Sequence, residues 1–150
     1  NTWRRLRIDN EPKQEASCAA LRQICAEILE PIVDRFGKPV VTYGFASQAL
    51  MKHVPGNITP TTDQHASCEL NRKGLPVCQR LGASVDLHVP GVKSLDVARF
   101  VMDRLPFDRL YFYDSRRPFH VSIGPDRKGD AVRMVVLPSG RLIPQRVRAL

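Results

Sequence analysis

The sequence predicts an α+β fold, with a small antiparallel sheet and N-terminal helices packed on one side of it. Apolar residues recur at helical spacing through residues 13–36. From residue 83 onward, most segments are short β-branched or aromatic runs separated by turn residues. Because helices come first and hairpin-like strands follow, the order is typical of α+β proteins. The 150 residues suffice for one domain with a sizeable core, so we expect a single domain over 1–150.

The first half of the chain contains the main predicted helix. Residues 1–12 are expected to form an extended lead-in, and residues 13–36 an amphipathic helix that ends at Gly37. Pro31 lies inside this helix and should kink it or separate its last turn. A short strand is predicted at 40–43 and a second helix at 46–53.

Residues 54–80 form a long predicted loop that carries His65. The segment is rich in Pro, Gly, Asn, Thr and charged residues and shows little periodicity. A loop of this length inside a compact domain is uncommon and is usually functional.

The second half is predicted to contain most of the strands. A strand at 83–89 precedes a helix that Ser94 can cap and that Pro106 ends. Strands at 109–113 and 119–123 form a hairpin around a turn at 114–118. A further hairpin is predicted from 131–137 and 141–144, which flank Pro138-Ser139-Gly140.

The four cysteines do not form a disulfide framework in a chain of this length. Cys18 and Cys25 fall on the predicted helix and are expected to be buried. Cys68 and Cys78 lie in the polar loop near His65, where a disulfide, a second metal site and free thiols are all open alternatives.

The formal charge is +8, and the basic residues concentrate near both ends of the chain. Such a surface either attracts a polyanion, such as nucleic acid or an anionic cell-wall polymer, or is simply a solvated basic surface. No nucleic-acid-binding motif accompanies the charge, and no apolar run has the length of a membrane span.

Three residues suit an open metal site: His65, Asp86 and His120. Two imidazoles and one carboxylate, with a fourth position for water, are typical of catalytic zinc. The ordinary alternatives are a surface loop histidine, a salt-bridging aspartate and a half-buried strand histidine. His88 shares a strand face with Asp86 and is interpreted as a bystander, whereas His53 is interpreted as a structural residue at a helix end.

These residues resemble the motifs of the M15 family of zinc D-alanyl-D-alanine peptidases, which share their fold with the Hedgehog signalling domain. The resembling fragments are Asp63-Gln64-His65, Gly82-Ala83-Ser84-Val85-Asp86 and Phe119-His120-Val121-Ser122. Thr42-Tyr43-Gly44-Phe45-Ala46-Ser47 is similar to the family's Ser-Gly-Tyr-Arg-Ser stretch. The resemblance covers about residues 38–124 and implies a Hedgehog/DD-peptidase-like fold, a Zn²⁺ cofactor and hydrolysis of a peptide amide bond.

The sequence departs from the family pattern at two functional positions. The substrate-gripping arginine of the family aligns with Ala46, and the position of its catalytic acid is Arg117. Asp114 and Glu69 are therefore the candidate general bases, although both residues are more often plain surface acids. Arg116 and Arg117 could stabilise an oxyanion or hold an acidic substrate group, or they could only solvate the turn. Tyr113 could line the cleft, or it could pack at the edge of the core.

Three functions therefore remain open at this point. The first is a zinc metallopeptidase, the second is a catalytically altered zinc-binding module, and the third is a basic nucleic-acid-associated domain with a structural zinc. The chain begins at Asn1 without a methionine, so we expect a processed or trimmed protein or a piece of a longer one. Four unpatterned cysteines and the lack of a signal in this chain favour the cytoplasm, whereas the family resemblance favours the bacterial envelope.

Overall fold

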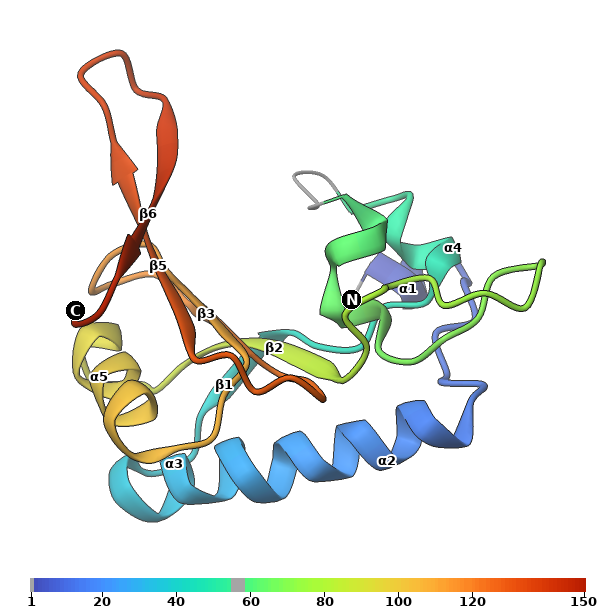
Figure 1. Ribbon diagram of the computed structural model, residues 1–150, viewed down its shortest axis with the longest axis horizontal. Coiled ribbons are helices and arrows are strands. Elements are labelled where there is room, and N and C mark those ends of the chain that lie inside the picture. Colours follow the sequence, from blue (N-terminus) through green and yellow to red (C-terminus); the bar gives the residue numbers. More distant parts are fainter. Residues whose placement is uncertain (1, 55–58) are drawn as a thin grey trace.

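A six-stranded sheet organises the computed structural model, which describes residues 2–54 and 59–150 (Figure 1). Its strands are β1 (Val40–Tyr43), β2 (Ala83–His88), β3 (Arg109–Phe112), β4 (Phe119–Ile123), β5 (Asp130–Val136) and β6 (Leu142–Val147). The spatial order is β1-β2-β4-β3-β5-β6. All neighbours are antiparallel except β3 and β5, which run parallel. The α+β class is therefore confirmed, but the sheet is mixed rather than purely antiparallel.

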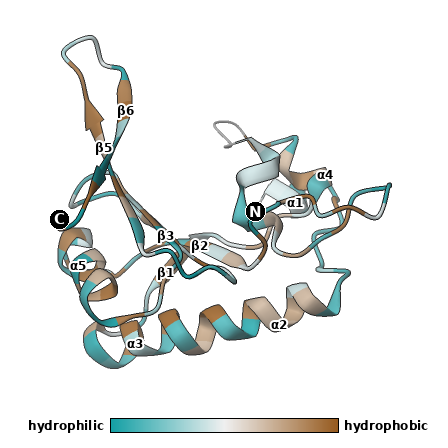
Figure 2. Cartoon of the chain, viewed as in Figure 1, coloured by the Kyte–Doolittle hydropathy of each residue, from teal (hydrophilic) through white to brown (hydrophobic). Residues whose placement is uncertain are grey.

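One face of the sheet is apolar and lies against helices. Helices α2 (Glu15–Ile24), α3 (Glu30–Phe36) and α5 (Ser94–Arg104) pack there (Figure 1). Buried residues from alternate strand positions meet Ile24, Ile28 and Ile32 of the long helix: Ala83, Val85, Leu87, Leu110, Phe112, Phe119, Val121 and Ile123. The helices carry hydrophobic and hydrophilic residues in alternation around their axes, as amphipathic helices do (Figure 2). The opposite sheet face is left for polar side chains.

The long helix was predicted at 13–36, and the structure corrects how it accommodates Pro31. A π-helical turn, Cys25–Leu29, joins α2 to α3, and Pro31 lies in the first turn of α3. Pro31 has no N–H to donate, so the wider turn before it keeps the helix continuous instead of separating its last turn. Cys25, expected to be buried, is exposed in this turn, whereas Cys18 is half-buried.

A second, smaller apolar cluster lies under the loop between β1 and β2. Helices α1 (Thr2–Arg5) and α4 (Gln48–Met51) belong to this part of the molecule. The cluster comprises Ala46, Leu50, Met51, Ala66, Val77 and Cys78, with Trp3 and Ile8 packed against it. The expected extended lead-in at 1–12 was therefore wrong at Thr2–Arg5, where Trp3 supplies the apolar contact that a short helix needs.

Other element boundaries differ from the sequence prediction in detail. The helix expected at 46–53 is limited to α4, which Ser47 caps by accepting a hydrogen bond from the Leu50 N–H. Ser94 begins α5 rather than capping it. The expected loop contains two 3₁₀ turns, Pro60–Thr62 and Gln64–Ala66, and a β-bridge between Leu70 and Pro76. None of the helices in the described part of the chain has the length and apolar character of a membrane-spanning segment.

Candidate metal centre

Sheet register places Asp86 and His120 side by side. Asp86 on β2 is directly opposite His120 on β4, and His120 is in turn opposite Tyr111 on β3. On the other side, Tyr43 of β1 is opposite Asp86. Residues opposite one another in neighbouring strands point to the same face, so these four side chains form a row across the polar face of the sheet.

His65 reaches the same place from the loop above the sheet. The Asp63 carboxylate accepts a hydrogen bond from the His65 backbone N–H at 3.0 Å and caps the 3₁₀ turn that carries the histidine. The backbone carbonyl of His65 accepts a hydrogen bond from the Ala46 N–H at 2.9 Å. The segment after β1 therefore holds His65 over the row of sheet residues.

Three side chains, those of His65, Asp86 and His120, bring their donor atoms within 4.8 Å of one another. Asp86 Oδ1 lies 3.3 Å from His65 Nε2 and 2.8 Å from His120 Nδ1. Two ligands about 2.05 Å from a tetrahedral zinc are about 3.3 Å apart. The first distance already matches that geometry, and the second needs only a small opening.

A backbone carbonyl determines which nitrogen of His65 faces the cluster. His65 Nδ1 lies 2.9 Å from the Gly44 carbonyl oxygen, which can only accept a hydrogen bond. Nδ1 must therefore carry a proton, so Nε2 faces the Asp86 carboxylate either with a lone pair or with a second proton that it donates to Asp86. Two lone pairs at 3.3 Å require a cation between them, either a proton or a metal ion. This arrangement is the outer hydrogen bond that metal-binding histidines usually make.

Burial and charge favour the protonation states that a metal site needs. Burial lowers the pKa of His120 and outweighs the opposing effect of the Asp86 carboxylate. Burial raises the pKa of Asp86, but hydrogen bonds from His120 and His65 outweigh it and hold that pKa below its usual range. The Asp86 side chain remains 32% exposed while the two rings are almost fully buried, so solvent reaches the cluster on the Asp86 side.

Tyrosine rings surround the cluster. The ring centroid of Tyr43 lies 4.3 Å from that of His65, and the centroid of Tyr111 lies 5.3 Å from that of His120. Burial and the nearby Asp86 carboxylate raise the pKa of Tyr113, so its hydroxyl remains a hydrogen-bond donor at neutral pH. The Arg117 guanidinium lies 5.2 Å from the Tyr113 ring centroid. Tyr113 and Arg117, both predicted to bind substrate, therefore lie beside each other at the margin of the cluster.

The two candidate general bases, Asp114 and Glu69, differ in exposure to solvent and in their hydrogen-bond partners. Asp114 is exposed in the turn after β3, and its Oδ1 accepts hydrogen bonds from the backbone N–H groups of Arg116 and Arg117 at 2.7 and 3.0 Å. Glu69 is buried, and its Oε1 accepts hydrogen bonds from the Lys13 and Gln14 N–H groups, just before α2. Glu69 thus anchors the start of the long helix, and Asp114 is the candidate that solvent can reach.

Two residues that support the site were missed by sequence reasoning. Gly44 contributes a carbonyl, and a backbone group leaves no mark in the residue pattern. Gln64 is buried next to His65, donates from Nε2 to the Leu81 and Ile123 carbonyls, and accepts at Oε1 from the Ser122 hydroxyl. Its position beside a candidate ligand was visible in the sequence, but a buried glutamine is recognised only from its partners.

The remaining candidates lie outside the cluster of donor atoms. Cys68 and Cys78 are free thiols, so the disulfide alternative is wrong for this structure. Neither cysteine joins the metal-ligand group found among the described residues. His88 is on the same strand face as Asp86, and its buried Nδ1 makes no hydrogen bond to the described residues. His53 is exposed beyond α4.

No protein-family model, curated protein or solved structure matches the chain. The interpretation of the site therefore depends on its own residues and geometry. Those residues are His65, Asp86 and His120, of which the two histidines are buried and the aspartate is half-buried, and together they could hold a metal ion.

Proposed function

We propose that this protein is a zinc-dependent hydrolase that cleaves a peptide amide bond. The convergence of His65 Nε2, Asp86 Oδ1 and His120 Nδ1, with His65 Nδ1 tied to the Gly44 carbonyl, carries the proposal. Two histidines and one carboxylate leave a fourth zinc position for water. The resemblance of the same three residues to the M15 peptidase pattern supports a peptide substrate and a Hedgehog/DD-peptidase-like fold.

The chain's own groups have distinct roles in this proposal. A bound zinc ion would supply an acidic water and polarise the scissile carbonyl. Asp114 would serve as the general base, accepting a proton from the attacking water and passing it to the leaving amine. The Tyr113 hydroxyl and the Arg117 guanidinium donate hydrogen bonds to the substrate carbonyl oxygen, while Arg116 faces solvent and attracts acidic substrates.

A zinc-binding module without turnover is the second candidate. Two observations favour it: Arg117 is at the position of the family's catalytic acid, and Glu69 is occupied by the Lys13 and Gln14 N–H groups. The two candidates share the zinc site, so one series of variants can distinguish them.

The first experiment is elemental analysis of protein purified without chelators. We expect one zinc per chain in the wild type, and loss of it in His65→Ala, Asp86→Ala and His120→Ala. His53→Ala, which removes an exposed histidine outside the cluster, is the matched control and should keep its zinc. Metal-free wild type, or cluster variants that retain full zinc, would refute the ligand assignment.

The second experiment measures release of new amino groups from a mixture of peptides, followed by mass spectrometry. We expect zinc-dependent cleavage, a kcat lower by about 10²–10⁴-fold in Asp114→Asn, and unchanged zinc content in that variant. Asp103→Asn alters an exposed acid on α5 and should leave kcat unchanged. Zinc binding without peptide cleavage would refute the hydrolase and support the zinc-binding module without turnover.

A further inference from the structure

The β5–β6 hairpin extends beyond the body of the sheet, and residues 133–145 are here called the arm. Pairing of β5 with β3 ends at Arg133, opposite Phe112, after which β5 pairs only with β6 among the described residues. The turn is closed by the Gly140 N–H donating to the Leu137 carbonyl at 2.8 Å, with Gly140 at φ +79°. Figure 1 shows the arm projecting away from the rest of the molecule.

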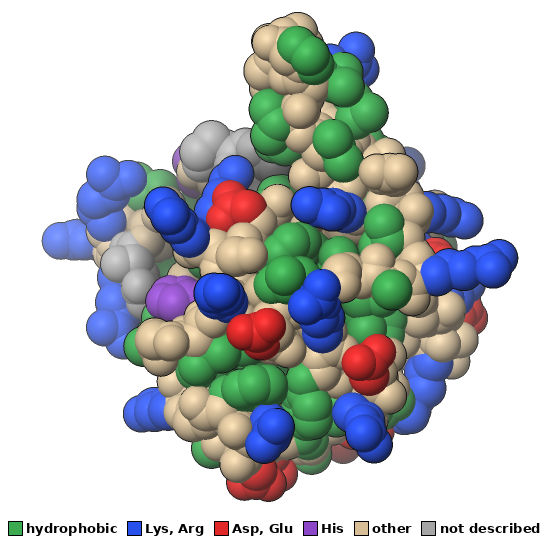
Figure 3. Space-filling model, turned by 90° about the vertical axis from the view of Figure 1, so that its left-hand side faces the viewer, with side chains coloured by type: hydrophobic (Ala, Val, Ile, Leu, Met, Phe, Trp, Pro, Cys, Tyr) green, Lys and Arg blue, Asp and Glu red, His purple; other side chains and the backbone are tan. Residues whose placement is uncertain are grey.

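The C-terminal segment that includes the arm has an excess of positive charge, with Arg133 and Arg141 on the arm itself. Residues 127–150 contain six cationic side chains and one carboxylate, which account for +5 of the net charge of +8. All six cationic residues are exposed: Arg127, Lys128, Arg133, Arg141, Arg146 and Arg148. On this side of the molecule Lys and Arg outnumber Asp and Glu, mostly below the projecting arm, whose visible surface is largely hydrophobic (Figure 3).

Half of these cationic groups have an acidic partner within the protein. Arg127 lies 2.9 Å from Glu27, and Lys128 lies 3.1 Å from Asp126. The one carboxylate of residues 127–150, Asp130, lies 3.0 Å from the guanidinium of Arg109, a largely buried partner. Arg146 is 3.8 Å from the same carboxylate and its side chain is 81% exposed. No ion pair joins Arg133, Arg141 or Arg148 to any acid among residues 2–54 and 59–150. Three guanidinium groups therefore remain available to an external anion.

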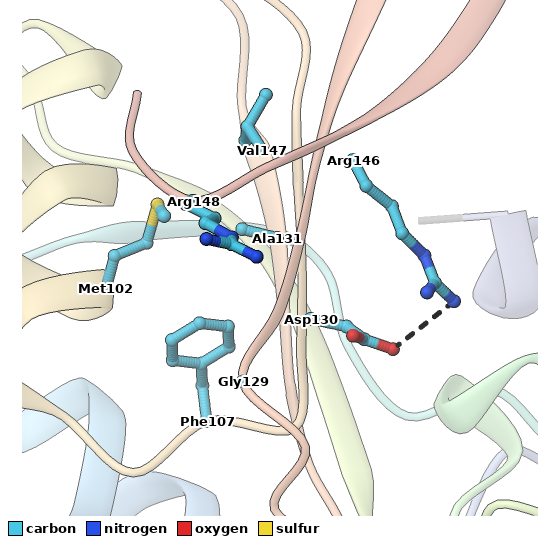
Figure 4. Close-up of a pocket in the computed structure, with 8 residues that line it drawn as sticks. All are labelled: Met102, Phe107, Gly129, Asp130, Ala131, Arg146, Val147 and Arg148. Atoms are coloured by element: carbon cyan, nitrogen blue, oxygen red, sulfur yellow. Dashed lines mark ion pairs between the residues drawn. The ribbon is translucent and has the colours of Figure 1, made fainter.

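The base of the arm continues the cationic surface. A pocket of about 580 Å³ lies there, between α5 and the ends of β5 and β6. Figure 4 shows Arg148 over this pocket, near Met102 and Ala131, while Arg146 points away from them towards Asp130. Cationic groups thus lie at the base of the arm as well as along it.

Both faces of the arm carry apolar side chains, but only one also carries arginine and glutamine. On that face Arg133 is directly opposite Gln145, and strand alternation adds the Val135–Ile143 pair and Arg141. The other face carries Met134, Val136, Leu142 and Pro144. Arginine and glutamine are the side chains that make paired hydrogen bonds to guanine and adenine in the major groove.

We propose that the arm binds double-helical DNA by entering the major groove. The major groove of B-form DNA, about 12 Å wide, admits a two-stranded β-ribbon, whereas the major groove of A-form RNA is too narrow. Arg133, Arg141 and Gln145 face the base edges, and Arg146 and Arg148 contact phosphates. The tip, Pro138-Ser139-Gly140, is exposed and has no aromatic side chain, whereas Val136 and Leu142 beside it are exposed apolar residues. The inference is independent of the zinc site.

The test measures fluorescence anisotropy of a labelled duplex of about 20 base pairs at salt concentrations from about 50 to 200 mM. We expect a linear fall of log K with log salt, with a slope of about −0.9 per phosphate contact. The double variant Arg133→Gln, Arg141→Gln should reduce the size of that slope by about 2. The matched control, Arg22→Gln with Arg72→Gln, removes the same charge from exposed positions outside the arm and should leave the slope unchanged.

Three results would overturn the proposal. These are no duplex binding at about 50 mM salt, an equal loss of slope in the two double variants, or tighter binding of single-stranded RNA or of anionic phospholipid vesicles than of the duplex. The four substituted arginines are exposed, and equal melting temperatures for all proteins verify that folding is intact.

Discussion

Asp86 is the carboxylate that both histidine rings of the candidate metal centre face. In metal-free protein the contact between His65 Nε2 and the Asp86 carboxylate requires a proton between them, because His65 Nδ1 donates its own hydrogen to the Gly44 carbonyl. Zinc binding replaces that proton, so metal affinity rises with pH until the histidines are deprotonated.

The buried His120 ring should make the metal-free protein less stable in mild acid. Its pKa is lowered by burial, so the unfolded chain takes up a proton on this histidine at a higher pH than the folded protein does. The stability due to neutral His120 is fully present above about pH 6.5 and is lost as the pH falls towards the lower pKa of the folded state.

Urea unfolding with chelator present, at pH 7.5 and pH 5, measures this effect. Between pH 7.5 and pH 5, we expect the free energy of unfolding to fall less in His120→Gln than in the wild type. His53→Gln should keep the wild-type fall, because His53 is exposed. A fall of the same size in His120→Gln would contradict the assignment.

At the scale of elements, Gly82 determines how β2 begins beside the end of β4. Its φ is +83°, and a Cβ there would lie 2.0 Å from the Ile123 carbonyl oxygen and 2.8 Å from the Gly124 Cα. Gly82→Ala should therefore cost more than about 2 kcal/mol in the free energy of unfolding. Gly91→Ala has a similar φ of +78° and no atom within 4 Å, so it should cost only about 1 kcal/mol. Equal losses, measured by urea unfolding, would contradict the steric explanation.

Glu69 connects the loop that carries His65 to the start of α2. Glu69→Gln weakens the hydrogen bonds to the Lys13 and Gln14 N–H groups, and we expect it to lower the free energy of unfolding by about 1 kcal/mol. Zinc content and kcat should be unchanged, because Asp114 is the proposed base. A large loss of kcat without loss of stability would instead support Glu69 as the base.

Element types followed well from local patterns, whereas pairing did not. The strands carrying Asp86 and His120 were predicted from short β-branched or aromatic runs that turn residues separate. The parallel pairing of β3 with β5 was missed because the sequence analysis paired only strands that follow one another in the chain, as hairpins do. Nothing in the local sequence shows that β3 also pairs with β5. The helix at Thr2–Arg5 was missed because its apolar contact, Trp3 against the second cluster, is made with residues far along the chain.

The candidate ligands could be predicted from residue types and their order in the sequence, but the other residues of the site could not. His65, Asp86 and His120 are residue types that bind zinc, so the sequence indicates them directly. The Gly44 carbonyl and the bonded Gln64 side chain depend on the path of the backbone, which no local spacing encodes. The roles of Asp114, Arg116, Arg117 and Tyr113 in catalysis remain predictions.

At the scale of the whole molecule, zinc should stabilise the folded chain, because the three ligands come from β2, β4 and the loop between β1 and β2. Free zinc at 100 times its Kd adds about 2.7 kcal/mol to the free energy of unfolding. For a domain of this size, that raises Tm by roughly 5–10 °C. Thermal scans with zinc and with chelator measure the shift, which Asp86→Ala should abolish. A shift of equal size in that variant would indicate zinc bound elsewhere.

The strand order separates the arm from the candidate metal centre. His120 lies on β4, and three strand spacings, about 14 Å, separate it from β6 at the opposite edge of the sheet. Substitutions that far apart are generally additive in their effects on stability. Residues 133–145 are therefore separable from the inner strands: selection could reshape the arm without changing the residues around the candidate metal centre, and could change those residues without altering the arm.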